Sequence, residues 1–321
     1  MLRPAVGLVA LSCTLSAGLL LAGCGSSGRS SAQSCPGTAG SLPAPAGKTL
    51  QDLAGSSPIG VVPGTSDYVP GRNRVSFLIV DQQSRTIATP VACVWVATGL
   101  KATPFARTLA QLEPVGVPGG SRGPMTSIYV TNVDLPKPGK YWLLAVPTGK
   151  EPLGALANLV VPPTPSGVPR IGDHAIASHT PTLASTDGKL SLLSTATHPD
   201  PRLYRISVAQ ALATHVPFVV AFATPKFCTS RVCGPVVDML DAVSKRLRNT
   251  PVRFIHVEIY ERNDPALGFN AWVKQWKLPT EPWTFLVDRR GVIRDRLEGA
   301  FSTDELERDI RTTLLASGAP S

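Results

Sequence analysis

PFVVAFATPKFCTSRVCGP, residues 217–235, is the stretch that decides the expected fold of the C-terminal part of the chain. Pro217–Ala223 is a continuous apolar run, the pattern of a central strand buried on both faces. A Gly-Pro pair then opens a helix, since proline suits a first helical position, where its missing N–H has no partner anyway. Cys228 and Cys233 lie between these two elements. The sequence therefore predicts a close cysteine pair at a strand-to-helix junction.

The segments that follow alternate between helix and strand. Apolar residues recur at helical spacing over 236–247, with acids early and bases late, as the helix dipole favours. A strand is predicted at Val252–Tyr260, a helix at Pro265–Trp276, and a hairpin from Trp283 to Leu297. Ser302 is a good N-cap for a last helix. The predicted order is β-α-β-α-β-β-α.

This order, with a cysteine pair after the first strand, resembles the thioredoxin-like superfamily over residues 199–321. The residues that carry the resemblance are Cys233-Gly234-Pro235, Glu281-Pro282-Trp283 before a strand, and Gly299 after the hairpin. The resemblance implies an α/β domain in which Pro282 is a cis-proline that exposes backbone for substrate pairing. It also implies that Cys228, Cys233, Pro282 and Glu281 form the catalytic site.

The cysteine motif departs from that family, because four residues separate Cys228 from Cys233 where the family has two. Thiol–disulfide exchange needs an accessible thiolate and a second cysteine that resolves the mixed disulfide. Distance from the strand favours Cys228 as the attacking residue and Cys233 as the resolving one, whereas the Cys-Gly-Pro match favours the reverse. Arg231 would stabilise either thiolate. In addition, Ala221 and Phe227 stand where the family has a buried acid and a tryptophan.

Glu281 is the unusual member of the predicted site, because the residue before the cis-proline is commonly uncharged in the family. A carboxylate beside a thiolate raises the thiol pKa, which makes the disulfide harder to reduce. The alternative to a redox site is a structural disulfide in a non-catalytic interaction or scaffold protein. The histidines are dispersed and no Cys/His cluster has zinc-ligand spacing, so the sequence predicts no cofactor and no metal.

Residues 70–165 predict a small all-β sandwich. Strand-like runs recur between Pro/Gly turns with little helical pattern, at 75–81, 90–98, 127–133, 140–146 and 159–161. The turn and strand around Tyr141 weakly resemble an immunoglobulin-like domain. Cys93 lies on one of these strands, either as a buried core thiol or paired with Cys35. Residues 166–198, rich in Pro, Ser and Thr, are expected to link the sandwich to the C-terminal domain.

The N-terminus predicts export and lipid attachment. Residues 1–23 have a basic start and an apolar stretch too short for an ordinary spanning helix, as in a signal peptide. They end in Leu21-Ala-Gly-Cys24, which resembles the bacterial lipobox and makes Cys24 the lipidation site. Residues 24–69, rich in Gly, Ser and Pro, are expected to form a flexible tether. The mature protein is therefore expected outside the cytoplasm, anchored to the membrane by lipid.

The distribution of charge in the sequence indicates which class of partner to expect. The formal net charge is +9, yet no run of five or more basic residues occurs, so the sequence predicts no nucleic-acid partner. The expected partner is a protein that supplies a thiol or a disulfide, and the expected activity is that of a thiol–disulfide oxidoreductase.

Overall fold

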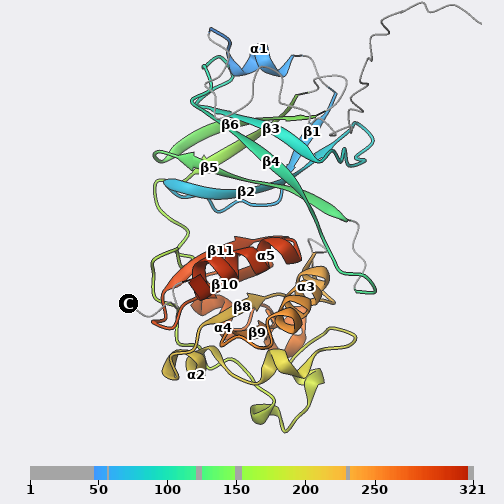
Figure 1. Cartoon of the computed structure of the whole chain (residues 1–321), viewed down its shortest axis with the longest axis vertical. Coiled ribbons are helices and arrows are strands. Elements are labelled where there is room, and N and C mark those ends of the chain that lie inside the picture. The colour runs from blue at the N-terminus through green and yellow to red at the C-terminus, as the bar shows by residue number, and fades with distance from the viewer. Residues whose placement is uncertain (1–46, 56–57, 121–124, 149–153, 229–231, 317–321) are drawn as a thin grey trace, which may run out of the picture. The chain divides into compact units, whose positions relative to one another are not determined.

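The computed structural model describes residues 47–55, 58–120, 125–148, 154–228 and 232–316 (Figure 1). All of these residues belong to one compact unit. Two sheets organise it, one with seven antiparallel strands and one with four strands of mixed direction. No helix within the described ranges is both long enough and apolar enough to cross a membrane.

The larger sheet nearly closes on itself. Every neighbouring pair of strands is antiparallel, and the two edge strands contact each other. Its interior is apolar, with Phe77 and Tyr129 stacked at 5.6 Å between ring centroids. The strands, in spatial order, are β1 (Gly60–Pro63), β2 (Gly71–Val80), β5 (Ser127–Leu135), β4 (Ala106–Pro114), β3 (Val91–Ala97), β6 (Gly139–Pro147) and β7 (Ala155–Val161).

The predicted β-sandwich is wrong, because one continuous sheet takes the place of two packed sheets. Strand β4 explains the difference. Its Ala, Leu, Gln and Glu residues favour a helix in isolation, so the sequence pattern did not indicate a strand there. In the fold β4 pairs with β3 on one side and β5 on the other, which joins all the strands into a single sheet.

Part of the segment expected to be a flexible tether is ordered. Helix α1 (Leu50–Ala54) begins with a capping box between Thr49 and Asp52, and its Leu50 is buried against the outer side of β3 and β6. Strand β1 follows it and forms one edge of the larger sheet. Short Gly- and Pro-rich elements such as these gain their stability from the sheet they pack on rather than from local propensity.

The four-stranded sheet holds the buried strand that the apolar run predicts. Strand β8 (Phe218–Phe222) pairs in parallel with β9 (Arg253–Val257) and antiparallel with β10 (Trp283–Val287). The edge strand β11 (Ile293–Glu298) pairs with β10. The side chains of β8 alternate between two apolar clusters, so both faces of this strand are covered.

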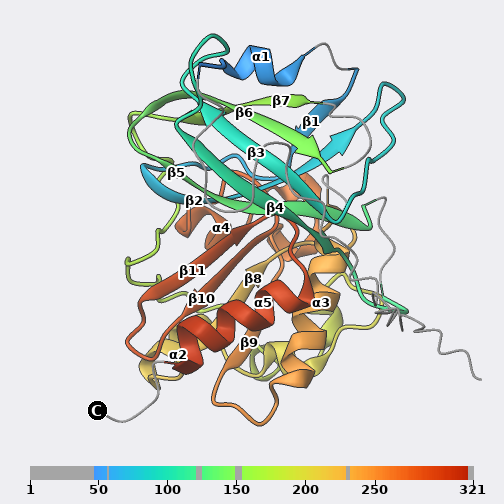
Figure 2. The same cartoon turned by 45° about the horizontal axis from the view of Figure 1, so that its top comes forward.

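Helices cover the two faces of this sheet. On one face lie α3 (Cys233–Arg246) and α5 (Thr303–Ile310), which contact each other and appear side by side in Figure 2. On the other face, Trp276 packs tilted against Phe222 at 5.1 Å between ring centroids. The helices α2 (Val208–Ala213) and α4 (Ala271–Gln275) contribute to that second cluster. The remaining helical segments of the described residues are five short 3-10 turns, η1 (Ala184–Thr186), η2 (Leu190–Leu192), η3 (Pro201–Tyr204), η4 (Glu261–Asn263) and η5 (Pro265–Leu267), and the π-helical η6 (Arg311–Leu315), which continues α5.

The predicted fold class, an α/β thioredoxin-like domain beside a small sandwich, is wrong for this chain. The part of the chain that the structure describes is predominantly β, with only 23% helix, and its larger sheet is the nearly closed antiparallel one. The strands and helices of 199–321 lie close to their predicted positions, but the order of elements alone does not establish a superfamily. The predicted helix over Pro265–Trp276 is reduced to a three-residue turn and the five-residue α4.

Candidate thiol site

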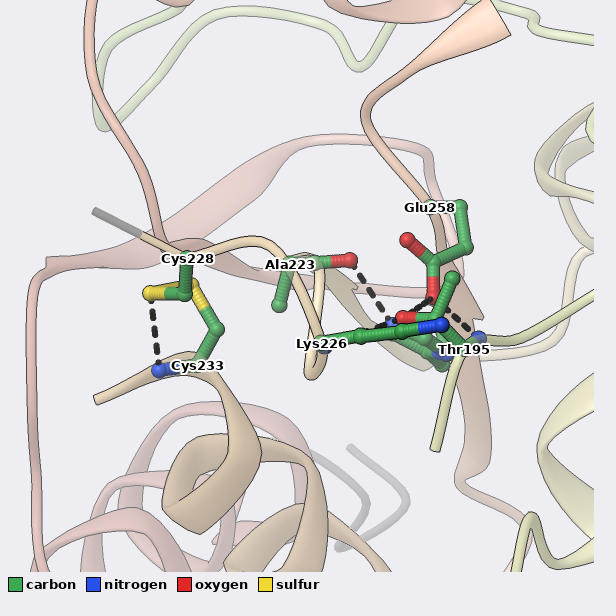
Figure 3. Close-up of a disulfide and its surroundings, with 7 residues drawn as sticks. Thr195, Ala223, Lys226, Cys228, Cys233 and Glu258 are labelled. Atoms are coloured by element: carbon green, nitrogen blue, oxygen red, sulfur yellow. Dashed lines mark hydrogen bonds between the residues drawn. A yellow bond between two sulfur atoms is a disulfide. The ribbon is translucent and has the colours of Figure 1, made fainter. Parts of the chain in front are cut away.

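The two predicted cysteines form a disulfide at the junction of β8 and α3. Cys228 follows the strand and Cys233 is the first residue of the helix, with 5.8 Å between their Cα atoms (Figure 3). Cys233 is fully buried in the apolar cluster beneath α3, whereas Cys228 is partly exposed. The two cysteines therefore differ in exposure, and Cys228 is the more accessible one.

The end of α3 faces the exposed cysteine. The Cys233 N–H donates a hydrogen bond to Cys228 Sγ, with 3.2 Å between the atoms (Figure 3). Val232, at the N-cap, gives the helix no side-chain cap. The positive end of a fourteen-residue helix is thus directed at Cys228 Sγ, where it would favour a thiolate over a thiol once the disulfide is reduced.

The carboxylate of Glu281 lies beside the disulfide, and Pro282 follows Glu281 in the chain. The peptide bond between them is cis. The two sulfurs and a carboxylate oxygen of Glu281 all lie within 4.8 Å of one another, and Glu281 is partly exposed. The charge of Glu281 also reaches Tyr260, whose phenol pKa is raised first by burial and then by that carboxylate. The structure therefore brings Cys228, Cys233 and Glu281 together, with Pro282 next to Glu281 in the chain, and the role of each stays a prediction.

A hydrogen-bonded clamp holds the loop that carries Cys228. The Lys226 N–H donates to Thr195 Oγ1 at 3.1 Å. Thr195 in turn donates its N–H and its hydroxyl to the same oxygen of Glu258, at 2.6 and 2.7 Å (Figure 3). Glu258 is buried, and its second carboxylate oxygen has no hydrogen-bond partner. Removing either side chain would release the loop from its support.

This clamp is not evident from the sequence pattern. Thr195 lies in the segment 166–198 that was expected to be a linker, and Glu258 lies inside the predicted strand Val252–Tyr260. An acidic residue within an apolar strand pattern was the only signal, since a buried carboxylate requires specific partners. Its partner, 63 residues away, could not be inferred from spacing.

A buried histidine fixes the end of β8 below the loop. His256 Nε2 donates to the Ala223 carbonyl at 3.0 Å, and its Nδ1 accepts from the Tyr204 hydroxyl at 2.7 Å. Burial lowers the pKa of His256 and raises that of Tyr204. Both groups are therefore neutral at physiological pH, which is the state that this pair of hydrogen bonds requires.

Other predicted residues are placed differently. Cys93 is fully buried and disulfide-bonded, so the interpretation as a free core thiol is wrong. Cys35, the partner considered for it, lies outside the described residues, as do Cys24 and Arg231. The lipidation site and the proposed electrostatic role of Arg231 therefore stay predictions.

Comparison with known proteins does not support a family assignment. The thioredoxin-like and immunoglobulin-like resemblances seen in the sequence are therefore corrected, and the site is interpreted from its own geometry. No known family model matches this chain, and no curated protein matches it significantly.

Proposed function

We propose that the Cys228–Cys233 pair carries out thiol–disulfide exchange with a protein partner. The observation that carries the proposal is the asymmetry of the pair. Cys228 is partly exposed and its Sγ accepts a hydrogen bond from an N–H at a helix N-terminus, while Cys233 is fully buried. An exchange reaction needs one accessible sulfur and one that resolves the mixed disulfide, and these two positions meet that requirement.

The exchange would proceed in two displacements. A thiolate of the partner attacks Cys228 Sγ, the bond between the two cysteines breaks, and its electron pair leaves on Cys233. A second thiolate of the partner then attacks the partner's own sulfur in the mixed disulfide and expels Cys228 as a thiolate. The partner is oxidised to a disulfide and the pair is reduced by two electrons; the same steps in reverse reduce a partner disulfide.

The competing function is a structural disulfide in a scaffold protein, and its reduction potential distinguishes the two. A disulfide with a working role should lie above about −300 mV, whereas a purely structural one should lie below it. Equilibration of the full chain with glutathione or dithiothreitol buffers, with the Cys228–Cys233 state quantified by mass spectrometry, measures this value. A potential below that limit would contradict the proposal.

Single cysteine variants identify the attacking residue. Cys233→Ser should accumulate a mixed disulfide with a partner protein, because the resolving thiol is absent while the accessible one remains. Cys228→Ser is the matched control and should accumulate none, because Cys233 is buried. Equal trapping by both variants, or by neither, would contradict the assigned roles.

We also propose that this exchange takes place outside the cytoplasm on a lipid-anchored protein. The lipobox-like Leu21-Ala-Gly-Cys24 supports this, and an oxidising compartment suits a chain with disulfides. Cys24→Ser should release the protein from membranes or block its processing. Unchanged membrane association of the variant would contradict the anchor.

A further inference from the structure

We infer that the reduced pair, together with Glu281, forms a zinc-binding site, so that the same three residues alternate between a disulfide and a metal-bound state. The inference rests on the proposed function in one respect, namely that the disulfide can be reduced. The observation behind it is the convergence of three donor atoms, two sulfurs and one carboxylate oxygen, within 4.8 Å of one another. They come from the end of the β8 loop, the start of α3 and the residue before the cis-proline.

The spacing suits a small cation with tetrahedral coordination. Zinc binds thiolate at about 2.3 Å and carboxylate at about 2.0–2.2 Å, so donor atoms in a tetrahedral site lie roughly 3.5–3.8 Å apart. The donors already lie within 4.8 Å in the oxidised state. Reduction of the disulfide lets the two sulfurs separate, and modest side-chain rotation then brings the three donors to coordination distance.

The donor chemistry selects the metal. Two thiolates disfavour calcium and magnesium, which take oxygen ligands, and favour zinc or another thiophilic ion. His256, which would be a further ligand for such ions, is committed to Tyr204 and Ala223. The site therefore has three protein ligands, and the partial exposure of Cys228 and Glu281 leaves the fourth position open to water or to a partner's side chain.

The metal also accounts for the position of Glu281. A carboxylate next to two thiolates is electrostatically unfavourable by itself, since like charges disfavour each other's ionised forms. A divalent cation reverses that relation. Binding converts two thiols to thiolates, forms two Zn–S bonds and one Zn–O bond, and releases two protons. The N-terminus of α3 further offsets the net negative charge of the zinc-loaded site.

The test is a cobalt and zinc titration of the full-length protein, reduced with a phosphine. Cobalt(II) should bind at one equivalent, with sulfur-to-cobalt charge-transfer absorption and the intense visible bands of four-coordinate cobalt. Zinc should displace it. Glu281→Gln should weaken zinc affinity, measured against a chromophoric chelator, by at least about tenfold, since even the loss of outer-shell partners costs that much. Glu261→Gln, at an exposed carboxylate nearby in the chain, is the matched control and should bind as the parent does.

The outcomes separate this inference from the proposed function. If the disulfide is reduced but cobalt produces no thiolate charge-transfer band, the zinc site is wrong and the exchange function stands. If Glu281→Gln binds zinc as tightly as the parent, Glu281 is not a ligand and the inference is overturned. If the folded protein resists reduction altogether, both proposals fail. Glu281→Gln keeps both cysteines, and its fold is checked separately by circular dichroism, where the spectrum should match that of the parent.

Discussion

Two regions of the molecule contain clusters of charged or reactive side chains. The side chains are buried in one region and partly exposed in the other. Where the two sheets meet, Arg74 pairs with Glu305 at 2.7 Å, and the two side chains are only 10% and 5% exposed. At the thiol site, Cys228 and Glu281 are both partly exposed. Buried charges with fixed partners hold segments together, while polar groups left accessible can react. We therefore expect the proposed exchange reaction at the end of β8 and a structural role for the contact between the sheets.

At the contact between the sheets, the buried charged side chains each make several hydrogen bonds. Arg74 also donates to the Ala300 and Glu298 carbonyls. The Glu298 carboxylate accepts hydrogen bonds from Ser66 and from the Asp67 N–H. In such a network each member is costly to remove.

Breaking the buried ion pair should produce the largest effect. Arg74→Met would leave Glu305 buried without its cation, which should lower the free energy of unfolding by about 3–5 kcal/mol. Denaturant titration measures this loss. Arg85→Met, which removes the partner of Asp81 in a pair whose arginine is 75% exposed, is the control and should cost about 0–1 kcal/mol. Equal losses in the two variants would contradict the structural role assigned to the contact.

Loosening the clamp behind Cys228 should have a smaller effect on stability and a specific one on exchange. Thr195→Val removes the hydroxyl that donates to Glu258 and accepts from the Lys226 N–H, while the backbone N–H at position 195 still donates to Glu258; the cost should be about 1–3 kcal/mol. We expect slower exchange with a protein thiol, because the loop no longer holds Cys228 against α3. Lys226→Ala keeps the backbone N–H that Thr195 accepts from, so it should leave the rate unchanged. A parent-like rate for Thr195→Val would show that the clamp does not position the site.

The thiol site was more accessible to sequence reasoning than the contact between the sheets. Continuous apolar residues and a Gly-Pro pair identify β8 and the start of α3, because these are local signals. Arg74 and Glu305 are 231 residues apart in the sequence, and no local sequence pattern predicts their pairing. Strand β4 was missed for a related reason, since its helix-favouring residues become a strand only through neighbours on both sides. Local order was thus predictable, whereas the fold class was not.

A pH dependence distinguishes the two regions further. Asp309 lies beside the contact between the sheets, in the lining of a cavity of about 1050 Å³. Burial first, and then Asp295 and Glu305, raise its pKa to about 7. A carboxyl that is protonated in the folded state up to that pH contributes stability at low pH, and this contribution is lost as pH rises from about 4 towards 7.

We predict that lowering the pH stabilises the parent protein relative to Asp309→Asn. Between pH 8 and pH 6 the unfolding free energy of the parent should rise by about 1 kcal/mol relative to that of the variant. Comparing the two proteins at each pH cancels the opposing contribution of His256, whose lowered pKa makes the fold less stable as pH falls. A constant difference between parent and variant would show that Asp309 titrates normally. The rate of thiol exchange, corrected for the intrinsic thiolate fraction, should have the same pH dependence in Asp309→Asn as in the parent.

The smallest expected effect is that of Glu281→Gln on the thiol pKa. It distinguishes most clearly between the thiol site and the contact between the sheets. Glu281→Gln keeps the size of the side chain and removes its charge from the vicinity of Cys228 and Cys233. In reduced, metal-free protein, loss of a like charge should lower the pKa of the attacking thiol and raise the reduction potential. The pKa change should be less than about one unit, because solvent screens partly exposed groups.

A thiol titration by ultraviolet absorbance, with a chelator present, measures that pKa, and Glu261→Gln serves as the control. An unchanged or raised thiol pKa in Glu281→Gln would contradict the electrostatic role. The free energy of unfolding should hardly change, since Glu281 is partly exposed whereas the side chain of Glu305 is buried. Removing a charge would then cost several kcal/mol at one region and almost nothing at the other, where it alters the chemistry of a thiol instead. That separation is what is expected if the contact between the sheets holds the fold and the end of β8 carries the reaction.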